Sequence, residues 1–336
     1  MIDFGRAICG DLAAAERREW LVTNGIGGFA SGTVAGTLTR CYHGLLIAAL
    51  DRPLGRTLLL TRLDEYAAYG GRTYPLFTNR WAEPLSAAAS AEQAPIARQA
   101  GAVEPHGFQY LERFHLEGTT PVWNYALADA LLRKRIWMQP GANVTYVCYT
   151  LERASAPLSL SLKALANYRD HHGSTQADEL TIEVTPAAQG LCCIAEHAVA
   201  PLFILSDRAE ALPQQTWYRD YFLTVEQERG LVTTDDHLYA GLFSVTLAPS
   251  ESLTMVASTD PEVSLDGAVA YALRQRYEAE LLSRVSWSAE PIVRRLALAA
   301  DQFIVERIVD KIPRAAASRR PGASPSYYGP GAKPNR

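Results

Sequence analysis

Arginine, tyrosine and histidine occur together in one short segment of the sequence, at Arg40, Tyr42 and His43. Arginine and histidine side chains donate hydrogen bonds to sugar hydroxyls, and a tyrosine ring offers a flat face on which a sugar can stack. The same residue types also serve as buried anchors between strands or as contacts between domains. The residue types leave these roles open, and they favour a buried or interdomain role over substrate binding.

A second polar segment follows a strand-like stretch and contains an amide, a guanidinium, a carboxylate and two adjacent histidines. We interpret it as another candidate for substrate binding or interdomain contact. Two adjacent histidines are weak evidence for a metal site, and no third ligand is evident at a workable spacing. We therefore predict no metal site, and we predict no cofactor. The candidate residues of this segment are Asn167, Arg169, Asp170 and His171, which His172 follows.

A third segment joins two aromatic residues to a charged pair, Trp217-Tyr218-Arg219-Asp220. Exposed aromatic rings here would form a platform for a sugar, whereas buried rings would belong to the core. We favour the core, and we retain Trp217 as a candidate for substrate binding or interdomain contact.

Neighbouring acidic residues raise the possibility of glycoside hydrolysis, which needs two carboxyl groups about 5–9.5 Å apart. The candidates are the pairs Asp64-Glu65 and Asp235-Asp236, together with Asp170. Adjacent residues of a strand point to opposite faces of the sheet, so a neighbouring pair cannot converge on one bond. We predict a turn at the second pair and assign no catalytic residue in this chain.

Glycines are concentrated directly after Asn24, with four of them in residues 25–32. The residues from Gly25 onward fit the G-x-G-x-x-A pattern of a nucleotide-binding loop, which needs a strand before it and a helix after it. Residues 20–22 are strand-like, but residues 31–40 are rich in glycine and β-branched residues and predict no helix. The stretch is therefore a bent, crowded segment of backbone, and Asn24 remains a candidate binding or interdomain residue.

Composition narrows the possible partners. The chain of 336 residues carries a formal net charge of −4, which gives no general attraction to nucleic acid or to an anionic membrane. No apolar run approaches the roughly 20 residues of a membrane span, and the N-terminus has no signal-peptide pattern. The five cysteines form no C-x-x-C pair, and the adjacent Cys192 and Cys193 are predicted as small buried apolar residues. We expect a reduced, cytoplasmic protein without nucleic-acid or membrane partners.

Short apolar or alternating segments, separated by turn residues, follow one another from about Glu19 to Thr259. A dozen or more such segments without intervening amphipathic helices predict a mainly β protein, a large antiparallel sandwich rather than a parallel α/β sheet. The alanine-rich stretch 86–104 is predicted as a long loop. The predicted strands are 45–50, 57–63, 108–114, 122–127, 144–151, 158–165, 180–184, 191–196, 202–205, 239–247 and 252–257.

The pattern changes after Thr259. Asp260-Pro261-Glu262 has the residue types of a helix start, and apolar residues recur at helical spacing in 265–285 and again in 292–308. After Ile312, proline, glycine, serine, alanine and arginine dominate, which is typical of disorder. We therefore divide the chain into a β-sandwich domain (1–259), a helical segment (260–312) and a disordered tail (313–336).

The run EWLVTNGIGGFASGTVAG at 19–36, followed by TRCYHGLLIAAL at 39–50, resembles the N-terminal domain of the bacterial and archaeal type of glycogen debranching enzyme, the amylo-α-1,6-glucosidase family. The resemblance implies a β-supersandwich like that of galactose mutarotase and of the glucoamylase N-terminal domain, followed by two helices that lead into an (α/α)6 catalytic barrel. It also implies glycogen or another α-glucan as substrate. In the complete enzyme, water would hydrolyse α-1,6-linked glucose at branch points.

The family's barrel carries a Trp-Gly-Arg-Asp motif that this sequence does not contain. We therefore expect a chain that is truncated or frame-shifted before its catalytic domain. Two alternatives remain open from the sequence. One is a stand-alone α-glucan-binding module, and the other is a mutarotase-like sugar enzyme.

Overall fold

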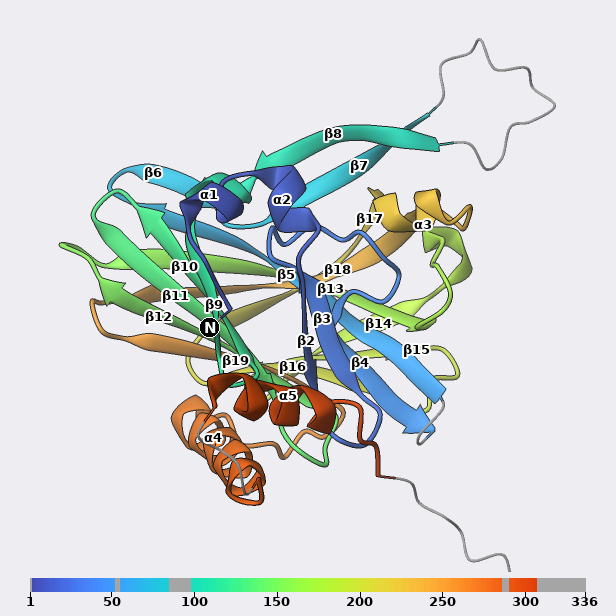
Figure 1. The fold of residues 1–336 in the computed structure, drawn as a ribbon. Helices are drawn as coiled ribbons and strands as arrows, with labels where there is room; N and C mark the ends of the chain where they lie inside the picture. The colour runs from blue at the N-terminus through green and yellow to red at the C-terminus, as the bar shows by residue number, and fades with distance from the viewer. Residues whose placement is uncertain (1, 52–54, 85–97, 286–289, 307–336) are drawn as a thin grey trace, which may run out of the picture.

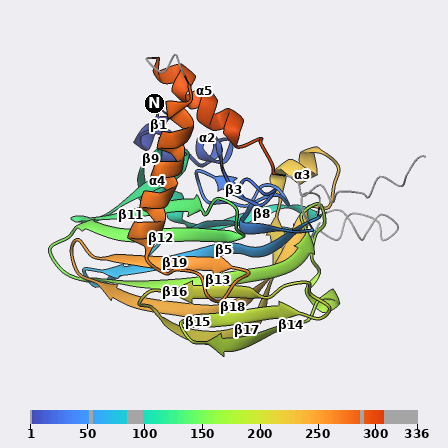
Figure 2. The ribbon, with the colours of Figure 1, turned by 90° about the horizontal axis from the view of Figure 1, so that it is seen from below.

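The computed structural model describes residues 2–51, 55–84, 98–285 and 290–306. The predicted disordered tail (313–336) lies outside these residues. Two large antiparallel sheets face each other and enclose the main apolar core, and two helices lie against one end of this sandwich (Figures 1 and 2). The predicted fold class, a mainly β antiparallel sandwich followed by two helices, is confirmed.

One sheet has nine strands in the order β1-β9-β10-β11-β12-β19-β16-β15-β14. Its middle strands come from distant parts of the sequence, because β19 lies between β12 and β16. The strand bounds are β1 Asp3–Phe4, β9 Leu111–Glu117, β10 Thr120–Leu127, β11 Ala130–Met138, β12 Val144–Arg153, β14 Ile182–Ala187, β15 Gly190–Ala195, β16 Leu202–Ser206 and β19 Ser252–Ser258.

The other sheet has ten strands in the order β2-β3-β4-β5-β13-β18-β17-β7-β8, with β6 paired to β5. It carries all the candidate binding residues, on its strands or on the turns next to them. The bounds are β2 Glu19–Thr23, β3 Phe29–Thr33, β4 Gly44–Asp51, β5 Gly55–Tyr69, β6 Arg72–Pro75, β7 Thr78–Pro84, β8 Arg98–His106, β13 Leu158–Asp170, β17 Glu210–Phe222 and β18 Thr234–Leu247.

The alternation of residue types explains how the sheets pack. In β13, Leu158, Leu160 and Leu162 are fully buried, while Ser159 between the first two is exposed. On the facing sheet, Tyr149 of β12 is also fully buried in the same apolar cluster. A strand with one apolar face buries that face against the opposite sheet. The alternation of apolar and polar residues therefore specifies both that the segment is a strand and which of its faces is buried.

The structure differs from the sequence predictions of strands in several places. Asp235 and Asp236 do not lie in a turn but near the start of β18, because this strand begins five residues before its strongly apolar part. Residues 98–104, predicted as part of a long loop, belong to β8, which pairs with β7. β11 and β17 were missed because charged or amide side chains interrupt their apolar pattern.

The C-terminal part of the described chain forms two helices, α4 (Gly267–Ser283) and α5 (Pro291–Asp301). Asp266 caps α4 by accepting a hydrogen bond from the Val269 amide at 3.0 Å, so the helix begins later than the predicted start at residue 260. α5 ends at Asp301, well before the predicted residue 308. The described residues also form three short α-helices, α1 Arg6–Cys9, α2 Leu12–Glu16 and α3 Thr224–Glu228, and two 3-10 helices, Gly107–Tyr110 and Ala177–Glu179.

Polar contacts fasten α4 to the nine-stranded sheet. Arg274 and Glu278 are buried, and Arg274 Nη2 donates to Thr119 Oγ1 at 2.6 Å. Arg274 Nε also donates to Glu278 Oε1 at 3.0 Å, and the same carboxylate accepts from the Thr119 amide at 3.2 Å. The apolar periodicity predicted the helix, but these charged residues dock it. None of the helices in the described ranges has the length and apolar character that crossing a bilayer requires.

Candidate functional site

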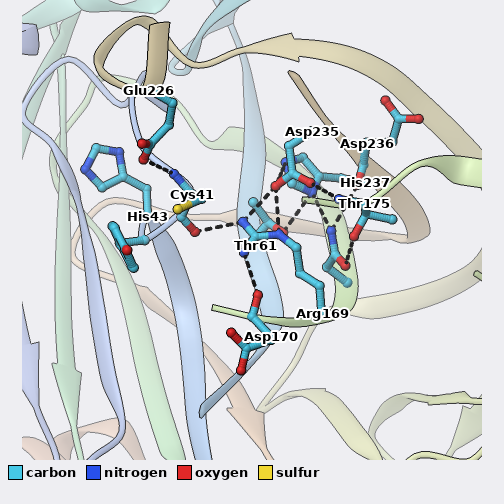
Figure 3. Close-up of polar contacts among 12 residues, drawn as sticks. Cys41, His43, Thr61, Arg169, Asp170, Thr175, Glu226, Asp235, Asp236 and His237 are labelled. Atoms are coloured by element: carbon cyan, nitrogen blue, oxygen red, sulfur yellow. Dashed lines mark hydrogen bonds and ion pairs between the residues drawn. The ribbon is translucent and has the colours of Figure 1, made fainter. Parts of the chain in front are cut away.

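The first and second candidate segments, far apart in the sequence, meet in the structure (Figure 3). The Arg169 guanidinium donates through Nη2 to the Cys41 carbonyl at 2.7 Å. Tyr42 Oη lies 2.9 Å from His172 Nδ1, and the Tyr42 ring packs edge-on against both histidines. These contacts connect the turn before β4 to the end of β13, so the two segments form one site.

A buried ion pair lies beneath this site. Arg169 donates through Nε and Nη2 to Asp235 Oδ2, at 2.9 and 2.7 Å, and through Nη1 to the Asp170 carbonyl at 3.1 Å. Asp235 Oδ1 accepts from the Thr175 amide at 2.8 Å. Burial raises the pKa of Asp235, and the Arg169 guanidinium opposes that rise. All three nitrogens of the Arg169 guanidinium therefore donate within the protein, which makes Arg169 a structural residue.

Asn167 extends the buried network toward β18. Its amide nitrogen donates to the Asp236 carbonyl at 3.0 Å and lies 3.1 Å from His237 Nδ1, and its oxygen accepts from Thr175 Oγ1 at 2.7 Å. Burial, followed by the charge of Arg169, lowers the pKa of His237 well below its ordinary value. His237 is therefore neutral, and it was not among the sequence candidates. The available signal was a histidine placed between an acidic pair and a continuous apolar run.

Arg40 and His43 lie on the other side of the first segment and share one carboxylate. Glu19 Oε1 lies 2.7 Å from Arg40 Nε and 3.5 Å from His43 Nε2. His43 Nδ1 accepts from the Thr39 amide at 3.2 Å, so the ring proton is on Nε2, toward Glu19. The contact with His43, and the charge of Arg40, lower the pKa of Glu19. His43 is 2 % exposed, so this group ties β2 to the turn before β4 and does not present a free histidine.

Asn24 has a structural role. Its side-chain oxygen accepts from the amides of Ile26 and Gly28, at 3.1 and 2.9 Å, and its nitrogen donates to the Ala142 carbonyl at 2.9 Å. The residue is 1 % exposed. Asn24 therefore holds the glycine-rich loop in shape and joins it to the turn before β12. The loop is followed by β3, which pairs antiparallel with β2, and not by the helix that a nucleotide-binding loop of this pattern requires.

Four rings form a partly exposed aromatic group, which we call the aromatic edge: Phe29, Tyr42, His171 and His172. The His171 ring centroid lies 6.5 Å from Phe29, 5.8 Å from Tyr42 and 3.8 Å from His172. Phe29 and Tyr42 are half-buried and His172 is exposed, whereas His171 is buried. Burial and the neighbouring His172 lower the pKa of His171. The aromatic edge therefore offers ring surface bordered by polar atoms.

A cavity of about 260 Å³ adjoins the aromatic edge. Phe29 belongs to both, and Arg56 lines the cavity while its carbonyl accepts from the His171 amide at 3.1 Å. The other walls are Leu21, Thr23, three glycines of the glycine-rich loop, Gln302, Ile304 and Val305. The Glu306 amide donates to the Gly25 carbonyl at 2.8 Å. The chain after α5 therefore runs past the same end of the sheet.

The candidate residue of the third segment, Trp217, does not join this site. Trp217 packs against the main core between the sheets, as favoured from the sequence. Tyr218 and Tyr221, on the opposite face of β17, belong to the small apolar cluster that includes Cys41 and Leu38. The face of the sheet that each of these aromatic residues occupies depends on the register of β17, which the sequence pattern did not show.

The neighbouring carboxylates are not arranged for hydrolysis. Asp64 is buried and pairs with Arg62 Nε at 2.7 Å, and Glu65 is buried and pairs with Lys134. Asp235 is held by Arg169, and Asp236 accepts two backbone amides. Each of these carboxylates has its partners inside the protein, so none is placed to act on a bound sugar.

The fold and the site define a β-sandwich domain whose polar cluster lies at one end of one sheet. The chain matches the family described as "Glycogen debranching enzyme N terminal" over residues 18–254. The chain therefore belongs to this family, as the resemblance of residues 19–50 predicted.

A comparison with curated proteins finds no match. Among solved structures, a bacterial glucoamylase crystallised with acarbose is similar, with 8% identity and a TM-score of 0.33. The alignment covers 84% of this chain and 36% of the glucoamylase chain, so this chain spans about a third of that protein's length.

Proposed function

We propose that this chain forms the N-terminal, substrate-side domain of a glycogen debranching enzyme of the amylo-α-1,6-glucosidase type. In that enzyme, a separate (α/α)6 domain would hydrolyse α-1,6-linked glucose at branch points of glycogen or another α-glucan. The family match over 18–254 supports the domain assignment, within our proposed sandwich domain 1–259. The internal pairing of the sandwich carboxylates supports the placement of the chemistry outside this domain.

The aromatic edge is the observation that carries the proposed contact with glucan. A pyranose ring has apolar faces and a rim of hydroxyls, so it binds where an aromatic surface is bordered by hydrogen-bonding groups. Phe29 and Tyr42 supply the half-buried ring surface, and the exposed His172 and Asp170 supply hydrogen-bonding atoms. Arg169, Asn167 and Asn24 act beneath the surface by holding these segments in place.

Affinity electrophoresis in gels containing glycogen tests the contact. We expect the wild-type chain to be retarded, and Tyr42→Ala with His172→Ala to abolish the retardation. His197→Ala is a matched control, because this side chain is 91 % exposed and lies outside the aromatic edge. Equal retardation of the double variant and the wild type would refute the assignment of the aromatic edge.

A second experiment tests whether hydrolysis requires the (α/α)6 domain. The chain alone is expected to release no glucose from limit dextrin, even when its circular dichroism spectrum shows that it is folded. Glucose release by the pure chain would show that the sandwich has its own hydrolytic site.

We also propose that the (α/α)6 domain packs against the apolar surface of the C-terminal segment. Ile292 and Leu296 on α5 are 59 % and 62 % exposed, and Phe303 and Ile304 follow them at 81 % and 66 %. Such a group of exposed apolar residues is typical of an interaction surface. The double variant Ile292→Ser with Leu296→Ser should self-associate less than the wild type, as measured by light scattering. Unchanged self-association would contradict this role.

We place the domain in the cytoplasm. All five cysteines are free thiols, and burial raises the pKa of Cys193 to about 12. Free thiols persist in a reducing compartment. Recovery of the protein with oxidised cysteines from its native cells would contradict this location.

A further inference from the structure

Three consecutive side chains at the end of β13 gather potential metal-binding atoms. One ligand atom from each of Asp170, His171 and His172 lies within 4.8 Å of the other two. From the sequence, no third ligand for the two histidines was evident. The turn after β13 supplies it, because it brings the Asp170 carboxylate back beside the imidazoles.

The spacing of two of these atoms already suits a bound ion. Asp170 Oδ1 lies 3.6 Å from His171 Nδ1. A tetrahedral ion with ligands at about 2.0–2.2 Å holds its ligand atoms roughly 3.3–3.6 Å apart. An ion between these two atoms would therefore need little movement of either side chain.

His171 supplies an independent observation. The residue is 5 % exposed, and its Nδ1 atom is buried without a hydrogen-bond partner. Buried polar atoms are nearly always satisfied, so an orphan nitrogen facing a carboxylate points to a missing partner. The Arg56 guanidinium is a cationic group close enough to His171 to oppose a bound ion.

The surroundings hold the ligands in position. The His171 amide donates to the Arg56 carbonyl at 3.1 Å, and the His172 amide donates to Asp170 Oδ1 at 2.8 Å. Tyr42 Oη lies 2.9 Å from His172 Nδ1. In the tautomer that donates from Nδ1 to Tyr42, Nε2 of His172 keeps a free lone pair. Metal-ligating histidines are usually oriented by such a hydrogen bond from the other nitrogen.

We propose that Asp170, His171 and His172 bind one divalent first-row transition-metal ion, with Zn²⁺ as the best match. Two imidazoles and one carboxylate suit Zn²⁺ and Co²⁺, whereas Mg²⁺ and Ca²⁺ prefer oxygen ligands. Three protein ligands leave the fourth coordination position of a tetrahedral ion open for water. Asp170 and His172 are exposed, so the ion can enter from solvent. The site does not depend on the proposed glucan contact.

Isothermal titration calorimetry of the tag-free full chain with Zn²⁺ tests the proposal. We expect one equivalent to bind, with the affinity lowered at least about tenfold by Asp170→Asn and by His172→Ala. Asp170→Asn keeps the oxygen that accepts from the His172 amide, and both side chains are exposed, so the fold is retained. Tyr42→Phe should lower the affinity by roughly 10–100-fold through the loss of orientation. His197→Ala, which removes an exposed histidine beside Glu196, should leave it unchanged.

Co²⁺ provides a readout that depends on the ligands. Binding should produce visible d–d absorption in the wild type and in His197→Ala, and none in His172→Ala. No Zn²⁺ binding by the wild type would overturn the proposal. Binding with the same affinity in wild type, Asp170→Asn and His172→Ala would also overturn it, because the ion would then be held elsewhere.

Discussion

Removing Arg169 tests how the buried ion pair holds the site together. The Arg169 guanidinium makes two hydrogen bonds to Asp235 and one each to the carbonyls of Cys41 and Asp170. Arg169→Met keeps much of the side-chain volume but leaves the Asp235 charge buried without a cation. Breaking such a pair from one side costs about 3–5 kcal/mol. Each kcal/mol corresponds to about 2–4 °C in a domain of this size, so Tm should fall by about 6–20 °C.

The loss should depend on pH in a defined direction. Burial already raises the pKa of Asp235 above its ordinary value, and removal of Arg169 takes away the charge that opposes this rise. The folded variant therefore binds a proton more readily than the unfolded chain. Stability of the variant should fall as pH rises above the ordinary aspartate pKa and level off once Asp235 is ionised in the folded state. The penalty of Arg169→Met should thus be smaller at pH 5 than at pH 7.

Urea denaturation of Arg169→Met, Asp235→Asn and the double variant provides the assay. The double variant should lose less than the sum of the single losses, by about 1–3 kcal/mol, because the two residues interact directly. Arg219→Met is the control, since Arg219 and its partner Asp178 are 50% and 82% exposed and should show no measurable effect. A cost for Arg169→Met below about 1 kcal/mol, or additive losses, would refute the reasoning.

Three further predictions concern stability. His237 is fully buried and neutral, whereas in the unfolded chain histidine titrates near 6.5, so unfolding takes up a proton below that pH. The free energy of unfolding should fall by about 2 kcal/mol as the pH is lowered from 6.5 to 5. His237→Gln should remove this part of the pH dependence, as measured by urea denaturation at each pH. Gly190 has φ +154°, and an added Cβ would lie 2.1 Å from the Ile204 carbonyl oxygen. Gly190→Ala should therefore lower the free energy of unfolding by about 2–5 kcal/mol. Gly141→Ala should lower it by only about 1–2 kcal/mol, because φ is +78° there and an added Cβ would have no atom within 4 Å. Glu278→Ala should cost about 3–5 kcal/mol and expose α4 to limited proteolysis, because it leaves Arg274 buried and unpaired; an unchanged cleavage pattern would contradict the polar docking of this helix.

The regular part of the sandwich could be predicted from sequence, because a period of two with apolar residues on one face specifies a strand and its buried side. β12 and β13 show this clearly. β11 could not be predicted in this way. It carries Arg133, Lys134 and Arg135, and Lys134 enters the interior because Glu65 and Tyr149 of other strands meet there. A buried charge of this kind is set by partners distant in the sequence.

The candidate site, too, could be predicted only in part from local sequence. Residue types alone selected Tyr42, Arg169 and His171 as members of a site. They did not show that Arg169 and Asn167 face inward, since this depends on Asp235 and His237 of a strand some 70 residues later. The link between Tyr42 and His172 also depends on the pairing of β13 with β5, which no local pattern encodes.

The order of strands in the two sheets has a consequence for synthesis of the chain on the ribosome. β19 (Ser252–Ser258) separates β12 from β16, and β18 (Thr234–Leu247) separates β13 from β17. Neither sheet can become continuous until these late strands leave the exit tunnel. At 5–20 residues per second, the first 258 residues take roughly 13–50 s to synthesise. During that time the nascent chain presents unpaired strand edges, so this domain should depend on chaperones more than its final stability suggests.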